Sequence, residues 1–177
     1  MPGRPCLAAV AAGVAAPAAG QQNHVLTGAG GWAAPGPTFS VFKSINQPST
    51  GGATVTFDKI EFDTANCFNI STSSYNPNVA GYYQVNASVY YQTDLPAGSY
   101  QLYLNKNGAV YKRGTNAEIP TSTGGLGINM STVVSMNGTT DYIQISTDKQ
   151  NNIRDVIMIG DLSGSLTWFN ATMVRPL

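Results

Sequence analysis

The sequence predicts an all-β protein: a single jelly-roll sandwich of about ten antiparallel strands, preceded by an irregular N-terminal arm. Three observations lead to this fold class. Apolar and polar residues alternate with a period of two from Thr38 nearly to the C-terminus, Gly, Pro and Asn interrupt the alternation at short intervals, and no segment shows a convincing helical period. Strands at such spacing are typical of a two-layer sandwich rather than a parallel sheet. We therefore expect a helix content near zero.

The clearest strand runs from Tyr82 to Tyr91. One face of it carries Tyr83, Val85, Ala87, Val89 and Tyr91, and the other carries Tyr82, Gln84, Asn86, Ser88 and Tyr90. This pattern predicts one buried and one wetter face. Similar alternation groups Phe39 with Val41 and Ile45, Val55 with Phe57, Tyr100 with Leu102 and Leu104, Leu126 with Ile128, Met130, Val134 and Met136, Ile143 with Ile145, and Phe169 with Ala171 and Met173.

Two Asn-Gly dipeptides separate strand-like runs, Asn107-Gly108 and Asn137-Gly138. Asn-Gly suits the tight turn in which both central residues need a positive φ. Both dipeptides therefore predict hairpins.

Residues 1–37 differ from the rest of the chain. They show no hydrophobic period, and Gly28–Pro37 is a run of helix and strand breakers. We expect residues 1–37 to form an attachment arm and residues 38–177 to form the folded knob.

Charge and composition exclude several classes of partner. Nine basic residues balance nine acidic ones, and charged residues make up only 10% of the chain. Such a chain lacks the basic patch that nucleic acid or an anionic membrane requires, and no apolar run is long enough to span a membrane. We expect neither nucleic acid nor a membrane as a partner. Cys6 and Cys67 are too few for a disulfide framework, and a free thiol at Cys67 is favoured over a bridge between them.

The residue types of the chain give little support for a catalytic function. The only histidine, His24, lies in the arm, so one chain cannot assemble a histidine-dependent triad or a histidine-rich metal site. The acidic residues are scattered, mostly near turns, where Asp side chains bond their own backbone. We expect no catalytic residue, no cofactor and no metal site, although an axial calcium ion stays open.

Residues 57–91 resemble the globular head of complement component C1q. The likeness rests on Phe57-Asp58, Phe62-Asp63, Phe68-Asn69, Tyr75 and Val79-Ala80-Gly81-Tyr82-Tyr83, and it continues through Asp141–Ile145 and Ser165–Phe169. The Phe-Ser-Gly-Phe ending usual in that family is absent. The resemblance covers roughly residues 38–175 and implies a ten-stranded jelly roll that forms tight trimers, a fold shared with tumour necrosis factor.

The arm carries a second resemblance. Residues 20–32, Gly-Gln-Gln-Asn-His-Val-Leu-Thr-Gly-Ala-Gly-Gly-Trp, are similar to a linker that precedes the terminal knob in tailed-phage fibre proteins. The collagen-like repeat that precedes animal C1q heads is missing. This likeness implies a protein of the phage virion, with Val25, Leu26 and Trp32 as candidate residues for attachment to other capsid or tail proteins.

Five tyrosines are candidates for the trimer contact or a ligand surface: Tyr82, Tyr83, Tyr90, Tyr91 and Tyr103. Tyrosine joins a large apolar ring to a polar tip and is enriched at interfaces. The chain has nine, more than one core of this size needs. We expect the surplus to line a three-fold axis or to contact a host receptor or glycan.

Three functions remain open at this point. The first is a homotrimeric virion knob, serving as capsid decoration or cement, or as a tail or fibre tip. The second is a secreted ligand- or carbohydrate-binding head, since Met1–Cys6 and the Ala-rich residues 7–19 resemble a weak signal peptide. The third is an enzyme or carbohydrate-active module, for which no constellation of residues is evident.

Overall fold

A computed structural model describes residues 18–19, 25–26, 32–33, 35–49, 51–150 and 155–177. The chain divides into two units, Met1–Pro35 and Gly36–Leu177. In the first unit, β1 (Val25–Leu26) pairs antiparallel with β2 (Trp32–Ala33). The second unit begins two residues before the expected boundary, because the Met173 N–H donates to the carbonyl of Pro37 at 3.1 Å.

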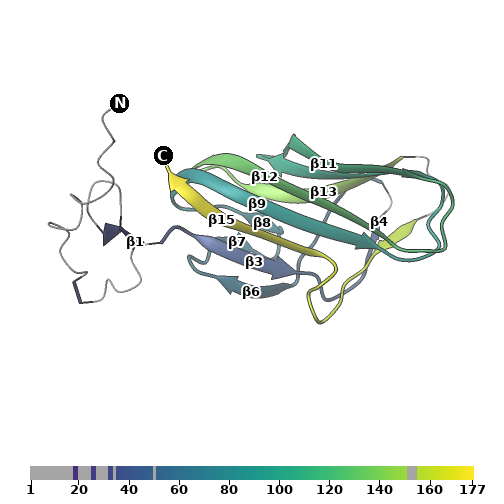
Figure 1. Cartoon of the computed structure of the whole chain (residues 1–177), viewed down its shortest axis with the longest axis horizontal. Helices are drawn as coiled ribbons and strands as arrows, with labels where there is room; N and C mark the ends of the chain where they lie inside the picture. Colours follow the sequence, from purple (N-terminus) through teal and green to yellow (C-terminus); the bar gives the residue numbers. More distant parts are fainter. Residues whose placement is uncertain (1–17, 20–24, 27–31, 34, 50, 151–154) are drawn as a thin grey trace, which may run out of the picture. The chain divides into compact units, whose positions relative to one another are not determined.

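The second unit is a sandwich of two antiparallel sheets, which confirms the predicted all-β architecture (Figure 1). The first sheet is named here the β9 sheet, after its longest central strand. β9 pairs with β12 on one side and with β15 on the other, and β15 is followed outward by β3 and β6. Its strands are β3 (Thr38–Phe42), β4 (Gln47–Ser49), β6 (Lys59–Asp63), β9 (Ala80–Tyr91), β12 (Leu126–Asn137), β14 (Val156–Met158) and β15 (Trp168–Pro176).

The second sheet is named the β10 sheet. It runs in the order β11, β10, β13, β8, β7, and β5 also pairs with β13. Its strands are β5 (Ala53–Thr54), β7 (Phe68–Asn69), β8 (Ser74–Tyr75), β10 (Gly98–Lys106), β11 (Ala109–Ile119) and β13 (Ile143–Gln150). No helix occurs among the described residues, and none of their segments is a helix long and apolar enough to cross a membrane.

The core between the sheets is built around an aromatic cluster. The ring of Phe39 lies 4.1 Å from that of Tyr75 and 4.9 Å from that of Phe169. Each such side chain contributes roughly 1.5–3 kcal/mol by leaving water. The predicted inward residues of β3, β9, β10 and β13 are buried in this core, but Ile45 is 67% exposed. Ile45 lies beyond the end of β3, where the alternation no longer applies.

Only one of the two predicted Asn-Gly hairpins forms. Asn107 and Gly108 have φ of 54° and 81° and join β10 to β11, which confirms the predicted hairpin. Asn137 and Gly138 do not form a hairpin, because β12 pairs with β9 whereas the next strand, β13, pairs with β10. The loop after Asn137 therefore crosses from one sheet to the other, and the Asn137 Oδ1 stabilises it by accepting from the N–H groups of residues 139, 140 and 141 at 3.0 Å.

Cys67 is a free, half-buried cysteine, as expected, and burial raises the pKa of its thiol. Its thiol donates to the carbonyl of Ala65 at 3.4 Å. Cys6 lies outside the described residues.

Candidate functional site

Two of the five candidate tyrosines belong to the core and not to the surface. Tyr83 and Tyr91 are fully buried, so the prediction that they face a partner or ligand is wrong. Their place follows from the alternation of β9, which directs every odd-numbered residue from 83 to 91 between the sheets. Tyr83 donates its hydroxyl to the Val79 carbonyl at 2.7 Å, and Tyr91 packs edge-on against Tyr100. Burial raises the pKa of both tyrosines to about 12.

The other three candidates lie on opposite sides of the sandwich. Tyr82 and Tyr90 are on the outward face of β9, where Tyr82 is 40% exposed. Tyr103 is on the outward face of β10, covered by Arg113, whose guanidinium carbon lies 5.0 Å from the centre of the tyrosine ring. The five tyrosines therefore do not form one surface. A role for Tyr82 and Tyr90 in assembly stays a prediction.

The outward face of the β9 sheet carries a network of amides and hydroxyls, which we name the amide face. It consists of Gln84, Asn86, Ser131 and Asn170, from three adjacent strands. Gln84 donates to the Ser131 hydroxyl at 2.9 Å, Ser131 donates to the Asn86 Oδ1 at 2.8 Å, and Asn86 donates to the Asn170 Oδ1 at 3.1 Å. These polar groups are thus partly satisfied within the protein before any partner arrives.

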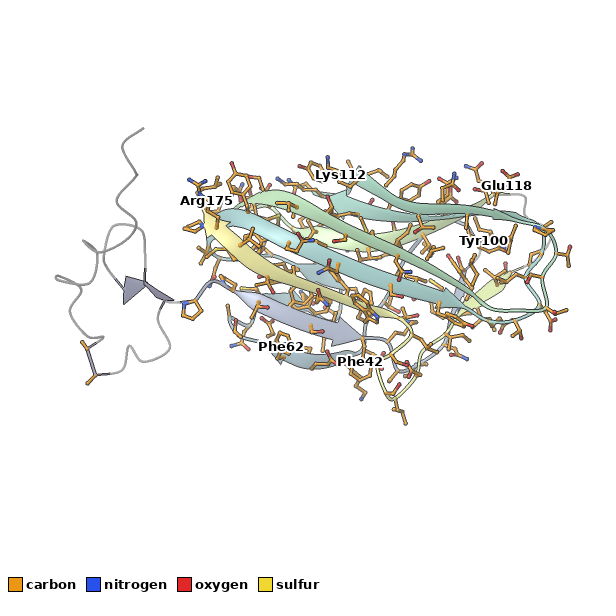
Figure 2. All side chains as sticks on the ribbon, in the orientation of Figure 1. Phe42, Phe62, Tyr100, Lys112, Glu118 and Arg175 are labelled. Atoms are coloured by element: carbon orange, nitrogen blue, oxygen red, sulfur yellow. The ribbon has the colours of Figure 1, made fainter. Side chains whose placement is uncertain are left out.

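Apolar and aromatic side chains surround the amide face. Val133, opposite Gln84 on β12, is 46% exposed. Trp168 of β15 lies opposite Ser88 of β9 and opposite Phe42 of β3. Because Ser88 is on the outward face of β9, the rings of Trp168 and Phe42 also lie on the outward side of the sheet. Figure 2 shows Phe42 and Phe62 on one side of the second unit, away from Lys112 and Glu118 of β11. Exposed apolar side chains beside polar groups that already bond one another form a surface suited to protein contact.

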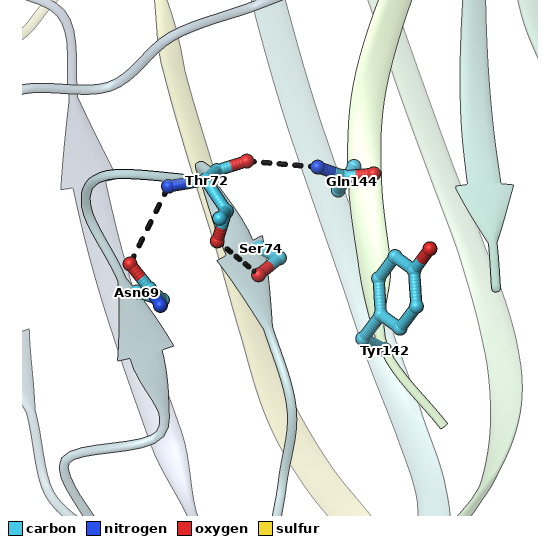
Figure 3. A pocket seen from close by; sticks show the side chains of 5 residues that line it. All are labelled: Asn69, Thr72, Ser74, Tyr142 and Gln144. Atoms are coloured by element: carbon cyan, nitrogen blue, oxygen red, sulfur yellow. Dashed lines mark hydrogen bonds between the residues drawn. The ribbon is translucent and has the colours of Figure 1, made fainter. Parts of the chain in front are cut away.

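The β10 sheet carries an open pocket on its outward side, with a volume of about 370 Å³. Asn69, Thr72 and Ser74 form one wall, and Tyr142 and Gln144 form the other (Figure 3). The two walls are about 70 residues apart in sequence and meet because β8 pairs with β13 between Tyr75 and Ile143. None of the five lining residues is charged, and their side chains offer amides, hydroxyls and one aromatic ring.

Local hydrogen bonds hold both walls in place. On one wall the Asn69 Oδ1 accepts from the N–H groups of Ser71 at 3.0 Å and Thr72 at 3.4 Å, which fixes the turn between β7 and β8. On the other, the Tyr142 N–H donates to the Asn107 Oδ1 at 2.9 Å, and the Tyr142 carbonyl accepts from the Asn107 N–H at 3.0 Å. Gln144 joins the walls by donating to the Thr72 carbonyl at 2.8 Å.

An ion pair between Lys106 and Asp141 fixes the loop that carries Tyr142. Lys106 lies 2.9 Å from the Asp141 carboxylate, which also accepts from the Asn107 side chain at 2.8 Å. Burial acts to raise the pKa of Asp141, but the hydrogen bonds from Asn107, Lys106 and the Asn137 N–H outweigh it and hold the pKa below its usual value. The charges near the pocket are therefore paired with each other.

Within the described ranges, no group of three or more His, Cys, Asp or Glu side chains could hold a metal ion. His24 lies outside the described residues.

The candidate attachment residues lie on the small pair of strands in the first unit. Leu26 pairs with Trp32, and Val25 pairs with Ala33. The structure thus brings Val25, Leu26 and Trp32 into one two-stranded ladder. That they attach the protein to a virion stays a prediction.

No protein-family model matches the chain, and no curated protein matches it in sequence. Solved structures do match its fold. The globular domain of zebrafish complement 1qA protein superposes with a TM-score of 0.58 at 16% identity, covering 80% of this chain and 99% of that domain. The chain folds as a C1q/TNF-like jelly roll. Eiger TNF from S. frugiperda gives a TM-score of 0.59 at 10% identity with 81% and 95% coverage, and murine APRIL gives 0.55 at 10% identity with 78% and 98% coverage.

Sequence reasoning identified β9 and its tyrosines but missed the pocket. Asn69, Tyr142 and Gln144 are all parts of the C1q likeness, but no pattern in the sequence groups them into one site. The one signal in the sequence is the Asn107-Gly108 turn, because Asn107 fixes the backbone of Tyr142.

Proposed function

We propose that this protein is a non-enzymatic, homotrimeric binding knob of a tailed-phage particle, to which the N-terminal arm attaches it. The knob serves as a capsid decoration or cement, or as a tail or fibre tip that contacts the host. Heads with the C1q/TNF-like fold commonly form homotrimers and are typically binding modules without catalysis.

The observation that carries the trimer is the outward face of the β9 sheet. It combines exposed apolar groups such as Val133 and Tyr82 with a polar centre whose members already bond one another. Burying polar groups that keep their hydrogen bonds costs little, whereas covering the apolar surround is favourable by roughly 25 cal/mol per Å². This face therefore gains free energy when a second copy covers it.

A three-fold arrangement fits the use of a knob on a particle. Three identical heads held together convert weak contacts at single sites into avidity, so no single head needs a deep pocket. The open pocket of the β10 sheet agrees with this requirement.

The position on a virion rests on the sequence of the arm. Residues 20–32 are similar to the linker before phage fibre knobs, and Leu26 and Trp32 pair in β1–β2.

Particles that lack the protein test this proposal. Wild-type protein and a variant without residues 1–35 are mixed with such particles, and incorporation is measured by sedimentation. We expect the variant to fold with a cooperative transition, because the second unit begins at Gly36, and to remain unbound, whereas the wild type incorporates. Higher heat resistance of the restored particles indicates cement, and restored adsorption to cells indicates a receptor-binding tip.

Equal incorporation of both proteins would contradict attachment by the arm. Incorporation of neither, together with a native protein whose first 19 residues are removed, would favour the secreted binding head instead.

A further inference from the structure

We propose that the pocket between the β7–β8 turn and Tyr142 binds a neutral saccharide. This inference deepens the proposed function and rests on it, since it assigns a ligand class and a site to the binding knob. The pocket volume of about 370 Å³ lies in the lower part of the range for small-molecule sites, ~300–1,000 Å³.

The lining chemistry selects a sugar among small ligands. A pyranose presents vicinal hydroxyls, each both donor and acceptor, around a ring with apolar C–H faces. Amide side chains offer an acceptor and two donors, which match such hydroxyls, and a tyrosine ring offers an apolar platform with a polar tip. Asn69 and Gln144 supply the amides and Tyr142 supplies the ring, as Figure 3 shows.

Hydrogen-bonding groups remain for a ligand. Asn69 uses its Oδ1 to fix the turn, and Gln144 uses its Nε2 on the Thr72 carbonyl. Within the part of the chain that the structure describes, no protein group bonds to the Asn69 Nδ2, the Gln144 Oε1 or the Tyr142 hydroxyl. The pocket thus offers one donor amide, one acceptor and one hydroxyl that can serve as either.

The absence of charge in the lining determines the class of sugar. No lining residue is ionised, and the neighbouring Lys106 is engaged by Asp141 at 2.9 Å and by the Ser135 carbonyl at 2.6 Å. A sialylated or sulfated sugar would bring an anion to a site with no cation to pair with it, and such an anion would lose hydration without compensation. The pocket therefore favours uncharged hexoses.

The walls are organised before the ligand arrives, which reduces the entropy lost on binding. Two hydrogen bonds between Asn107 and Tyr142, one in each direction, fix the backbone of Tyr142, and the Asn69 turn fixes Thr72. The pocket also lies on the β10 sheet, whereas the proposed assembly face lies on the β9 sheet. Three pockets of a trimer would thus stay open to a glycan-coated surface.

Binding of the full-length protein to immobilised glycans tests the inference. The probes are neutral oligosaccharides of glucose, galactose and mannose, with sialylated and sulfated counterparts. We expect Y142A and Q144A to weaken binding to a neutral glycan by about tenfold or more, which corresponds to ~1.4 kcal/mol per decade. Y142F should weaken it less, since the ring remains. The matched control is Y111A, which removes an exposed tyrosine of β11 outside the pocket and should change binding by less than about twofold.

Wild-type protein that binds no neutral glycan, or only the anionic ones, overturns the inference, as does equal binding by Y142A and wild type. The mass and the unfolding midpoint of the same samples are measured in parallel. A trimer that incorporates into particles yet binds no neutral sugar would defeat the saccharide site alone, whereas a monomer that does not incorporate would defeat the proposed function.

Discussion

At the scale of single residues, Lys43 is a buried charge whose pKa the fold shifts strongly. It follows β3 and is only 3% exposed. Its ammonium donates to the Thr56 carbonyl at 2.7 Å and to the Thr56 hydroxyl at 2.8 Å. Burial lowers the pKa of Lys43 to about 8, and the charge of Asp58 offsets this only in part. The folded protein therefore releases this proton more readily than the unfolded chain does.

This difference predicts that stability rises with pH. Between pH about 8 and 10.5 the unfolded chain binds more protons at Lys43 than the folded protein, so the free energy of unfolding increases with pH. From pH 7.5 to 9.5 we expect a gain of about 2 kcal/mol from this residue. Denaturant titrations at fixed protein concentration measure it. The range stops at pH 9.5 because tyrosines of the unfolded chain ionise near pH ~10 and reverse the trend.

Lys43→Met should abolish this rise of the free energy of unfolding with pH, since it leaves no titrating group at that position. Lys112→Met, at an exposed position of β11, is the control and should keep the rise. An unchanged pH slope in Lys43→Met would show that another group is responsible.

At the scale of elements, the two sheets approach each other closely where β11 passes β12. The Thr115 hydroxyl donates to the Asn129 carbonyl at 2.8 Å and accepts from the Asn129 N–H at 3.2 Å. Next to it, a Cβ at Gly114 would lie 2.7 Å from the Met130 Cβ and 3.1 Å from the Asn129 carbonyl oxygen. Only a residue without a side chain fits at this point of the edge.

Gly114→Ala should therefore destabilise the knob by about 1–3 kcal/mol through overpacking. Gly124→Ala is the matched control, because its Cβ would meet nothing closer than the Ser122 Oγ at 3.7 Å. Urea unfolding midpoints of the two variants measure the difference. Equal midpoints would mean that β11 can move away from β12 at no cost.

Elements also show what the sequence could predict. Alternation along β9 predicts its inward residues, whereas the abundance of tyrosine points to one shared surface; the period of two decides against it, because it separates Tyr82 from Tyr83. Asn107-Gly108 and Asn137-Gly138 have the same local chemistry, yet only the first forms a hairpin, because long-range pairing decides which strand follows. The pocket was missed for the same reason: Asn69 and Tyr142 meet only through the pairing of β8 with β13.

At the scale of the whole molecule, the two sheets differ in the surfaces they present. The outward face of the β9 sheet joins a bonded amide network to exposed apolar groups, and we assign it to assembly. The outward face of the β10 sheet carries the neutral pocket, and we assign it to recognition. With these proposed assignments, three copies would associate without covering the proposed recognition sites.

Substitutions at two exposed valines, one on each sheet, test the assignment of the assembly face in one experiment. Val133 is 46% exposed on β12, in the assembly face, and Val110 is 53% exposed on β11, in the other sheet. A carboxylate buried in an interface without a partner is strongly unfavourable, whereas one on a free surface is tolerated. Val133→Asp should thus disrupt the trimer, and Val110→Asp should preserve it.

Light scattering of the wild type and both variants at micromolar concentration measures the central claim most directly. We predict a mass near three times 18.6 kDa for the wild type and for Val110→Asp, and a mass near 18.6 kDa for Val133→Asp. A wild-type mass near 18.6 kDa, or a Val133→Asp variant that remains trimeric, would contradict the account.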